Sequence, residues 1–157
     1  MNILTRPATL SDLPAIIALF QHAVMAISGQ VYSYEQKQAW VSRGVDVVRW
    51  QEKVTSQYFL VAEAEGIIGF GSIETSGYLD TLYVHPRYQR QGIAQQLLER
   101  LEAWAILQSI AFITTEASIV AKPFFERNRY YVVKPQEKRI NEIPLTNYRM
   151  EKSLTHE

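Results

Sequence analysis

Cysteine is absent from the sequence. A chain without thiols forms no disulfide framework, has no thiolate metal site and carries no covalent intermediate on a cysteine nucleophile. Histidine, aspartate and glutamate are present, but no group of them has the spacing of metal ligands, so we expect no metal. Any chemistry that the protein performs must therefore use other groups.

Charge of one sign and long apolar runs are also missing. The 16 Lys and Arg residues balance the 16 Asp and Glu residues, so the chain lacks the long-range field that attracts nucleic acid or an anionic membrane. We expect neither as a partner. No stretch approaches about 18 uninterrupted apolar residues, and residues 1–7 lack the apolar core of a signal peptide. These absences predict a soluble, cytoplasmic protein.

Length and composition favour one domain. The chain has 157 residues, 47% of them hydrophobic, and only seven glycines and six prolines interrupt it. That length suits a single domain, and this share of apolar side chains is enough to fill its interior. Because no repeat, charge block or linker divides the chain, we expect residues 1–157 to form a single domain.

Hydrophobic periodicity predicts a mixed sheet flanked by helices. Apolar residues at helical spacing predict helices over 13–27, 34–43, 46–55, 93–107 and 120–128. Short β-favouring runs bounded by turns predict strands over 58–62, 67–73, 78–84, 111–115, 130–138 and 145–151. The strand-helix-strand unit over 78–115 implies a right-handed crossover and a parallel pair, in a sheet that begins with antiparallel hairpins. The expected fold class is α/β with a mixed sheet.

The most informative segment is the loop Gln89–Ala94, which precedes the helix over 93–107. Backbone N–H groups at a helix N-terminus have no intrahelical acceptors and lie at the positive end of the helix dipole, so they form a site for phosphate or pyrophosphate. Gly92 permits close approach of a ligand, Ala94 keeps the first turn open and Arg90 adds charge. A glycine at a helix start is, by itself, equally compatible with no ligand. The loop matches neither a P-loop nor Gly-x-Gly-x-x-Gly, which disfavours nucleoside triphosphates and a Rossmann-type enzyme.

Two motifs resemble the GCN5-related N-acetyltransferase (GNAT) family. The acetyl-CoA signature of that family, Gln/Arg-x-x-Gly-x-Gly/Ala, is similar to Gln89-Arg90-Gln91-Gly92-Ile93-Ala94, which here follows Leu82-Tyr83-Val84-His85-Pro86. The family's Ala-x-x-Phe-Tyr-Glu-x-x-Gly-Phe helix is similar to residues 121–130. The order of expected elements is similar along essentially the whole chain. Residues 32–40, 117–118 and 122–127 further resemble the small bacterial acetyltransferases of the YafP type.

The resemblance implies a GNAT-like acyl-CoA N-acyltransferase fold, a mixed sheet of six to seven strands flanked by helices, with acetyl-CoA (coenzyme A) as the cofactor. The loop amides would hold the pyrophosphate. The signature strand, splayed from its neighbour near Thr114, would pair with the pantetheine arm. The residues expected to contact the cofactor are Leu82, Tyr83, Val84, Gln89, Arg90, Gln91, Gly92, Ile93, Ala94, Ser118, Phe124 and Phe125.

Acetyl transfer to an amine requires a neutral amine, a hydrogen-bond donor for the developing oxyanion and a thiolate that is stable enough to leave. For the base we expect Asp80, on the strand face of Leu82 and Val84, where apolar neighbours would raise the pKa of its carboxyl. A solvated strand carboxylate is an equally good interpretation of Asp80. Glu74 and Glu116, at the ends of the neighbouring strands, are the alternatives.

The resemblance also implies an oxyanion donor and a general acid. A backbone N–H of the signature strand around Tyr83 would serve the oxyanion. Phe125 stands where relatives commonly have a tyrosine acid, and Ser118 where many have an asparagine. Three alternatives stay open: the thiolate leaves with help from water, the acid is another tyrosine (Tyr83, Tyr130 or Tyr131), or activity is weak. Late-strand aromatic residues are also commonly core.

Aromatic side chains gather in the region where the acceptor is expected to bind. We expect the acceptor to contact His22, Tyr32, Tyr34, Trp40 and Glu74. Aromatic walls suit an apolar or cationic acceptor, although core packing explains them as well. The predicted function is an acetyl-CoA-dependent N-acetyltransferase that acts on a primary amine of a small molecule or a protein, by direct attack in a ternary complex. The alternative is a non-catalytic acyl-CoA-binding module, and the sequence leaves a homodimer open.

Overall fold

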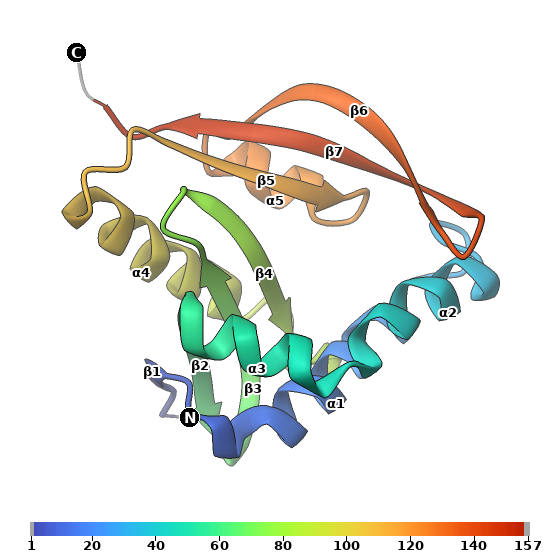
Figure 1. Cartoon of the computed structure of the whole chain (residues 1–157), viewed down its shortest axis with the longest axis horizontal. Helices are drawn as coiled ribbons and strands as arrows, with labels where there is room; N and C mark the ends of the chain where they lie inside the picture. Colours follow the sequence, from blue (N-terminus) through green and yellow to red (C-terminus); the bar gives the residue numbers. More distant parts are fainter. Residues whose placement is uncertain (1, 156–157) are drawn as a thin grey trace.

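The computed structural model describes residues 2–155, which contain a seven-stranded sheet with helices on both faces (Figure 1). The strands are β1 (Leu4–Pro7), β2 (Tyr58–Ala64), β3 (Gly66–Ile73), β4 (Tyr78–Val84), β5 (Phe112–Ser118), β6 (Tyr131–Ile140) and β7 (Ile143–Ser153). The helices are α1 (Leu13–Met25), α2 (Tyr34–Ser42), α3 (Val47–Ser56), α4 (Ile93–Leu107) and α5 (Lys122–Arg127). The sheet order is β1-β2-β3-β4-β5-β7-β6, in which β4 and β5 are parallel and the other neighbours antiparallel. The predicted mixed sheet is confirmed.

Two parts of the sheet were not visible in the local sequence pattern. β1 has four residues, too few for a periodicity, and it is held by antiparallel pairing with β2. β6 and β7 extend beyond their predicted ranges and meet at a turn of Asn141 and Glu142, whose φ angles are 51° and 66°. Two successive left-handed residues are typical of a type I′ hairpin, which usually contains glycine. The turn therefore lacks its usual sequence signal.

Separate hydrophobic clusters cover the two faces of the sheet. On one face α4 and α5 bury the side chains Ile93, Leu97, Leu98, Leu101 and Phe125 against the strands. On the other face α1 and α3 bury Leu13, Ile16, Phe20, Val24 and Trp50. Burial of each such side chain contributes about 1.5–3 kcal/mol, so both helical layers are fixed firmly to the sheet. The strands are thereby held as a rigid support for the loops at their ends.

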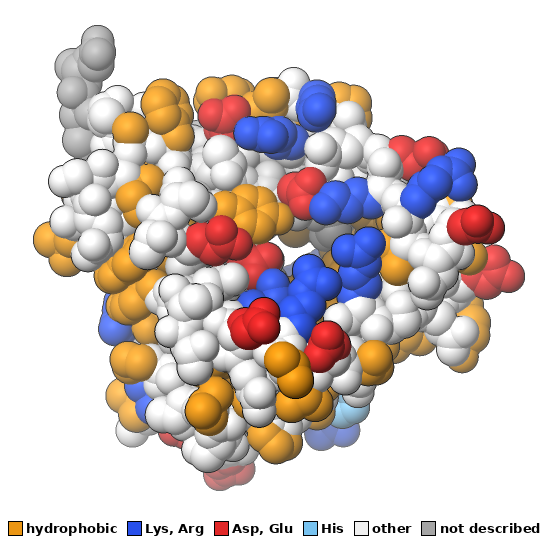
Figure 2. All heavy atoms as spheres, in the orientation of Figure 1, with side chains coloured by type: hydrophobic (Ala, Val, Ile, Leu, Met, Phe, Trp, Pro, Cys, Tyr) orange, Lys and Arg blue, Asp and Glu red, His pale blue; other side chains and the backbone are white. Residues whose placement is uncertain are grey.

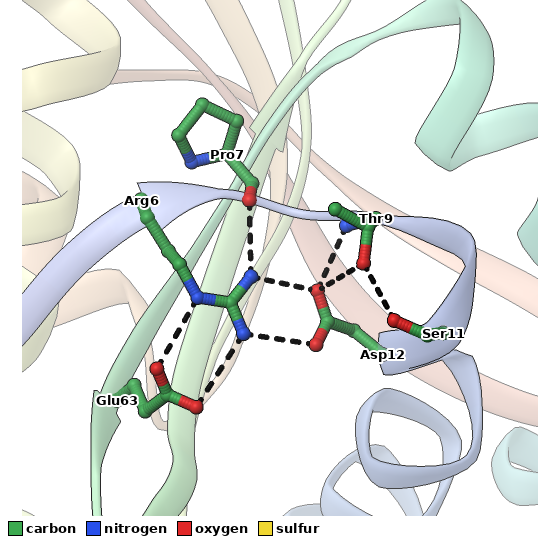
Figure 3. Close-up of polar contacts among 6 residues, drawn as sticks. All are labelled: Arg6, Pro7, Thr9, Ser11, Asp12 and Glu63. Atoms are coloured by element: carbon green, nitrogen blue, oxygen red, sulfur yellow. Dashed lines mark hydrogen bonds and ion pairs between the residues drawn. The ribbon is translucent and has the colours of Figure 1, made fainter.

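Arg6 ties β1 to its neighbouring strand and to the start of α1 (Figure 3). Its guanidinium donates to both carboxylate oxygens of Asp12 at 2.9 Å, and its Nε donates to Glu63 at 3.2 Å. Asp12 also accepts from the backbone N–H of Thr9 at 2.8 Å. These contacts, with the hydrogen bonds from Arg6 as the largest cause, lower the pKa of Asp12 from 3.8 to about 2. A four-residue edge strand is thus held by side chains as well as by its ladder.

β4 and β5 form a fork. Among the described residues they pair only through Tyr78 with Thr114 and Leu79 with Thr115, and beyond these residues the strands diverge (Figure 1). The Thr115 hydroxyl donates to the Leu79 carbonyl at 2.9 Å and closes the base of the fork. The splay expected near Thr114 is therefore present, and it leaves the C-terminal half of β4 without a neighbour on that side.

Candidate active site

The loop before α4 presents amide hydrogens that have no acceptor in the protein. The first helical bond runs from the Gln96 N–H to the Gly92 carbonyl at 3.0 Å, and no group among residues 2–155 accepts from the backbone N–H groups of residues 91–95. Gly92 has a φ of +80°, and a Cβ built on it meets no protein atom within 4 Å. Space beside the amides is therefore open, as an anion site requires.

The side chains of this loop differ in their exposure. Gln89, Arg90 and Gln91 are all exposed, and the Gln89 side-chain amide donates weakly to the Val84 carbonyl at 3.4 Å. Ile93 is buried in the cluster under α4. Ile93 can therefore offer a ligand only its backbone amide, whereas Arg90 and Gln91 are free to reach a phosphate with their side chains.

The open edge of β4 offers backbone groups to a ligand. The N–H of His85 donates to the Ile68 carbonyl of β3 at 2.8 Å. Because N–H groups alternate between the two edges of a strand, the amides of Val84 and Leu82 point to the opposite edge, where β5 has diverged, and that of Tyr83 points toward β3. The oxyanion donor expected around Tyr83 is thus available from its neighbours and not from Tyr83 itself.

A cleft of about 200 Å³ lies at the fork, and we call it the β4–β5 cleft. Its walls come from α1, the α1–α2 loop, α2, α3, β4, β5 and the β6–β7 hairpin, which lie far apart in the sequence. Figure 2 shows Lys and Arg side chains gathered around a hollow in the middle of this face of the molecule. The side chains relevant to chemistry and recognition that line the cleft are Tyr32, Trp40, Arg43, Arg49, Trp50, Lys53, Tyr78, Asp80, Tyr83, Glu116, Ser118 and Lys138.

Asp80 lines the cleft, but its carboxylate has polar neighbours and not the apolar ones that we expected. The carboxylate forms an ion pair with Lys53 of α3 and accepts from the Gln57 side-chain amide at 2.9 Å. A β-bulge causes the difference, because the β3–β4 register shifts between Leu79 and Thr81 and leaves Asp80 as the extra residue. Asp80 therefore faces α3, whereas Leu82 packs on the opposite face, against the cluster under α4.

Glu116 of β5 is a second carboxylate in the cleft. Lys138 forms an ion pair with it, Gln136 donates to it at 2.8 Å and the Tyr78 hydroxyl donates to it at 3.2 Å. Burial acts to raise the pKa of Glu116, but the hydrogen bonds from Lys138 and Gln136 and the charge of Lys138 outweigh it, so the pKa lies below its ordinary value. Glu116 is therefore charged at neutral pH.

The tyrosines proposed as acids have different surroundings. Tyr130 lies outside the cleft, buried in the cluster under α4, where its hydroxyl donates to Glu102 at 2.8 Å. We therefore remove Tyr130 from the catalytic candidates. Tyr83 lines the cleft with its ring against Phe20 (5.2 Å between centroids), and burial raises the pKa of its hydroxyl. Tyr78, which sequence reasoning missed, also lines the cleft, and burial raises the pKa of its hydroxyl.

Three residues expected to contact the acceptor lie outside the β4–β5 cleft. Tyr34 is 61% exposed at the start of α2, and its hydroxyl accepts from Gln38 at 2.7 Å. His22 lies on α1 beside His85, with 5.9 Å between the ring centroids. Glu74 lies in the β3–β4 turn, where its backbone N–H donates to the Tyr78 carbonyl. The structure therefore does not bring these three residues together with the rest of the expected acceptor site, because proximity along the chain did not predict which way each side chain points.

Tyr32, Trp40 and Ser118 do line the cleft, as parts of its wall. The buried Tyr32 hydroxyl donates to the Thr146 carbonyl at 2.6 Å and accepts from the Ile119 N–H at 2.9 Å, and burial raises its pKa. Trp40 packs against the Tyr32 ring. The Ser118 hydroxyl accepts from the Ala121 N–H at 3.1 Å, which shapes the turn into α5. These contacts hold the wall in place.

Phe124 and Phe125 of α5 point into different surroundings. Phe125 is 3% exposed and packs against Tyr130, with 5.0 Å between the ring centroids, whereas Phe124 is only partly buried. Phe125 is therefore a core residue in this chain, and Phe124 is the aromatic side chain of the pair that remains accessible.

The sequence analysis missed the basic lining of the cleft. Arg43 follows α2 and Arg49 lies in the first turn of α3, in segments whose only strong sequence signal was helical. Lys53 and Lys138 reach the cleft from α3 and β6. No local pattern groups these four residues, because Lys138 lies 85 to 95 positions along the chain from the other three.

Two negative observations hold for residues 2–155. No three or more His, Cys, Asp or Glu side chains come together in a way that could hold a metal ion. No helix in that range combines the length and the apolar character needed to cross a membrane.

The fold and the site define a class of protein: an acetyltransferase with free helix-start amides and an open strand edge beside a cleft. The family model described as an acetyltransferase (GNAT) domain matches residues 29–152. The chain belongs to the GNAT family and is an N-acetyltransferase.

Its relatives include a protein of the type expected from the sequence. The uncharacterized N-acetyltransferase YafP of Escherichia coli (strain K12) is 35% identical over 156 residues, which cover 99% of each chain. A GCN5-related N-acetyltransferase (Aminotransferase, Class-II) from Rhodopseudomonas palustris has a similar structure, with a TM-score of 0.92 and 30% identity over 98% of this chain and 97% of that one. The PaiA N-acetyltransferase of Thermoplasma acidophilum, solved in complex with coenzyme A, gives a TM-score of 0.81 at 20% identity over 98% and 99%.

Proposed function

We propose that the protein transfers an acetyl group from acetyl-CoA to a primary amine by direct attack in a ternary complex. The observation that carries the proposal is the pair of unsatisfied backbone surfaces, the amides of residues 91–95 and the open edge of β4 at Leu82 and Val84. The first suits a pyrophosphate and the second suits the amide-containing pantetheine arm. The coenzyme A complex of the structurally similar PaiA N-acetyltransferase supports this choice of cofactor.

Residues of the loop and of β4 would hold the cofactor. The amides of residues 91–95 bind the pyrophosphate, with Arg90 and Gln91 at its rim. Leu82 and Val84 pair their backbone groups with the pantetheine arm as an added strand. Acetyl-CoA supplies an acetyl group activated as a thioester. Because Leu82 is nearer than Val84 to the base of the fork, we assign its N–H as the oxyanion donor.

The β4–β5 cleft would hold the acceptor and move the proton. Asp80, on the signature strand and inside the cleft, accepts the amine proton, with Glu116 as the alternative base. Tyr83 lines the cleft, and its hydroxyl is protonated at neutral pH as in any tyrosine, so we assign it as the proton donor to the leaving thiolate. Burial raises its pKa and so makes it a weaker acid than a solvated tyrosine. Lys53 and Gln57 hold the Asp80 carboxylate in position.

Thiol release tests this function directly. Purified protein is mixed with acetyl-CoA and a panel of primary amines, and free thiol is measured over time against a control without amine. Amine-dependent release with an acetylated product supports the proposal. Absence of calorimetric binding to both coenzyme A and acetyl-CoA would overturn it.

Two observations favour the second candidate, a non-catalytic acyl-CoA-binding module. Both carboxylates of the cleft are engaged in ion pairs with lysines, and Phe125 replaces the family's tyrosine. This candidate predicts binding of acetyl-CoA without thiol release for any amine. The same two measurements therefore separate the candidates.

A further inference from the structure

We infer that the acceptor amine also carries an oxyanion, a carboxylate or a phosphate, and that Arg43 and Arg49 bind this group. The inference rests on the proposed function, because it names the class of molecule that the β4–β5 cleft receives. It replaces the apolar or cationic acceptor that the aromatic residues suggested.

The cleft has a local surplus of positive charge although the whole chain has none. Four cationic side chains, those of Arg43, Arg49, Lys53 and Lys138, line it together with two carboxylates. The two lysines are neutralised by those carboxylates, in the pairs Lys53–Asp80 and Lys138–Glu116. Two positive charges are left over, and both belong to arginines.

Neither arginine has a partner for its guanidinium. Within residues 2–155 no side-chain hydrogen bond or ion pair involves Arg43 or Arg49. Two acids, Asp46 and Glu52, lie three positions from Arg49 along the chain. Asp46 accepts from the backbone N–H of Arg49 at 3.3 Å, which caps α3, and among residues 2–155 no ion pair joins Glu52 to either arginine.

Arg6, by contrast, is fully paired in its own cluster. Other arginines that have no such partner within the described residues, such as Arg90 and Arg100, lie outside the cleft, whereas Arg43 and Arg49 both line it.

The chemistry of the wall favours an oxyanion as their partner. A guanidinium presents a planar fork of donors that matches a carboxylate or a phosphate through two parallel hydrogen bonds. Trp40 and Trp50 line the same wall, and the Trp50 indole N–H is already used by the Gly44 carbonyl at 2.9 Å. Arg43 and Arg49 are exposed residues beside these rings, so their guanidinium groups are accessible to a partner that enters the cleft.

The arginines and the carboxylates of the cleft come from different elements. Arg43 and Arg49 come from the α2–α3 region, whereas Asp80 and Glu116 come from the forked strands next to the open edge of β4. A molecule that places its oxyanion at the arginines can therefore place its amine at the carboxylates, where the acetyl group would be delivered. A cleft of about 200 Å³ suits a small molecule of this kind.

Matched pairs of amines test the inference. Phenylalanine is compared with 2-phenylethylamine, and O-phosphoethanolamine with ethanolamine, so that each pair differs in the anionic group. We expect at least one anionic member to have a kcat/KM about tenfold or more above its uncharged partner. The two pairs also tell which oxyanion, carboxylate or phosphate, is preferred.

Variants locate the preference. Arg43→Gln and Arg49→Gln should each raise KM for the anionic amine about tenfold and leave KM for its uncharged partner within twofold. Arg100→Gln, an exposed arginine on α4 away from the cleft, is the matched control and should change neither. Binding of the same pairs to the coenzyme A complex is measured by calorimetry, which needs no turnover.

The possible failures are distinguishable. Equal turnover and equal binding of both members of each pair overturns this inference and leaves the acetyltransferase function standing. A preference that persists in the double variant Arg43→Gln/Arg49→Gln also overturns it. Binding of coenzyme A with a preference for the anionic member, but with no thiol release, supports the anionic site and counts against catalysis.

Discussion

The residue Gly92 provides the sharpest test of the cofactor site. Its φ of +80° lies in the left-handed region, where an L residue costs about 1–2 kcal/mol. A Cβ at this position meets no protein atom within 4 Å, so Gly92→Ala should destabilise the fold by that strain alone. Gly66 matches it closely, because its φ is +104° and a Cβ there also meets nothing within 4 Å. Gly66→Ala at the β2–β3 turn is therefore the control for strain without a ligand.

The effect on binding should be larger than the effect on folding. The new methyl group enters the open space beside the amides of residues 91–95 and keeps an anion from approaching them. Each hydrogen bond to a charged group contributes about 1.5–3 kcal/mol, so weakening one or two of them costs about 3 kcal/mol. A loss of that size corresponds to a dissociation constant for coenzyme A about a hundredfold higher.

Calorimetric titration with coenzyme A and denaturant unfolding are measured on both variants and on the unsubstituted protein. We expect similar losses of unfolding free energy in both variants and weaker binding only in Gly92→Ala. If Gly92→Ala binds coenzyme A within twofold of the unsubstituted protein, the helix-start amides do not hold the pyrophosphate and the assignment of the site is refuted.

Three further predictions concern the base, the edge strand and the cleft wall. Asp80→Asn should lower kcat about a hundredfold with KM for acetyl-CoA unchanged, and Glu116→Gln less; the reverse order in steady-state kinetics would make Glu116 the base. Because Arg6 lowers the pKa of Asp12 from 3.8 to about 2, the stability that this pair contributes is present above about pH 4 and is lost as the pH falls to about 2. Asp12→Asn should remove this part of the pH dependence of the unfolding free energy. An Asp12→Asn variant whose unfolding free energy still falls with the same slope between about pH 4 and about pH 2 would contradict it. Tyr32→Phe removes two partly buried hydrogen bonds to the backbone, worth about 1 kcal/mol each, and should cost about 2 kcal/mol in chemical unfolding. A cost below about 0.5 kcal/mol would mean that water replaces the hydroxyl.

Elements with a strong local pattern could be predicted closely. α4 begins at Ile93 and ends at Leu107, as its apolar stripe indicates, and the glycine before it marks the start. The amide site follows from this one helix start, because the unpaired N–H groups are a property of the first turn and need no distant residue. The open edge of β4 required the resemblance to a family, since a strand sequence does not say where its neighbour diverges.

Side-chain directions were harder to predict than elements. A strand pattern of period two places Asp80 with Leu82, but the bulge in β4 breaks the period at that residue and turns its carboxylate toward Lys53. Tyr130 carries a hydroxyl that could act as an acid, but its side chain is buried in the core. Its partner Glu102 is 28 positions away, on a different element.

The sequence by itself determined the order and type of most elements, the mixed sheet and the unpaired amides at the start of α4, for which we propose a pyrophosphate. These features depend mainly on residues that are close together in the sequence, and the hydrophobic pattern along the chain records them. Only the tertiary structure decided the charge and the lining of the β4–β5 cleft. Arg43, Arg49 and Lys138 meet there because α2, α3 and the β6–β7 hairpin fold against the forked strands. A net charge of zero over the whole chain conceals this local surplus, since charge acts over distances in space and not along the sequence.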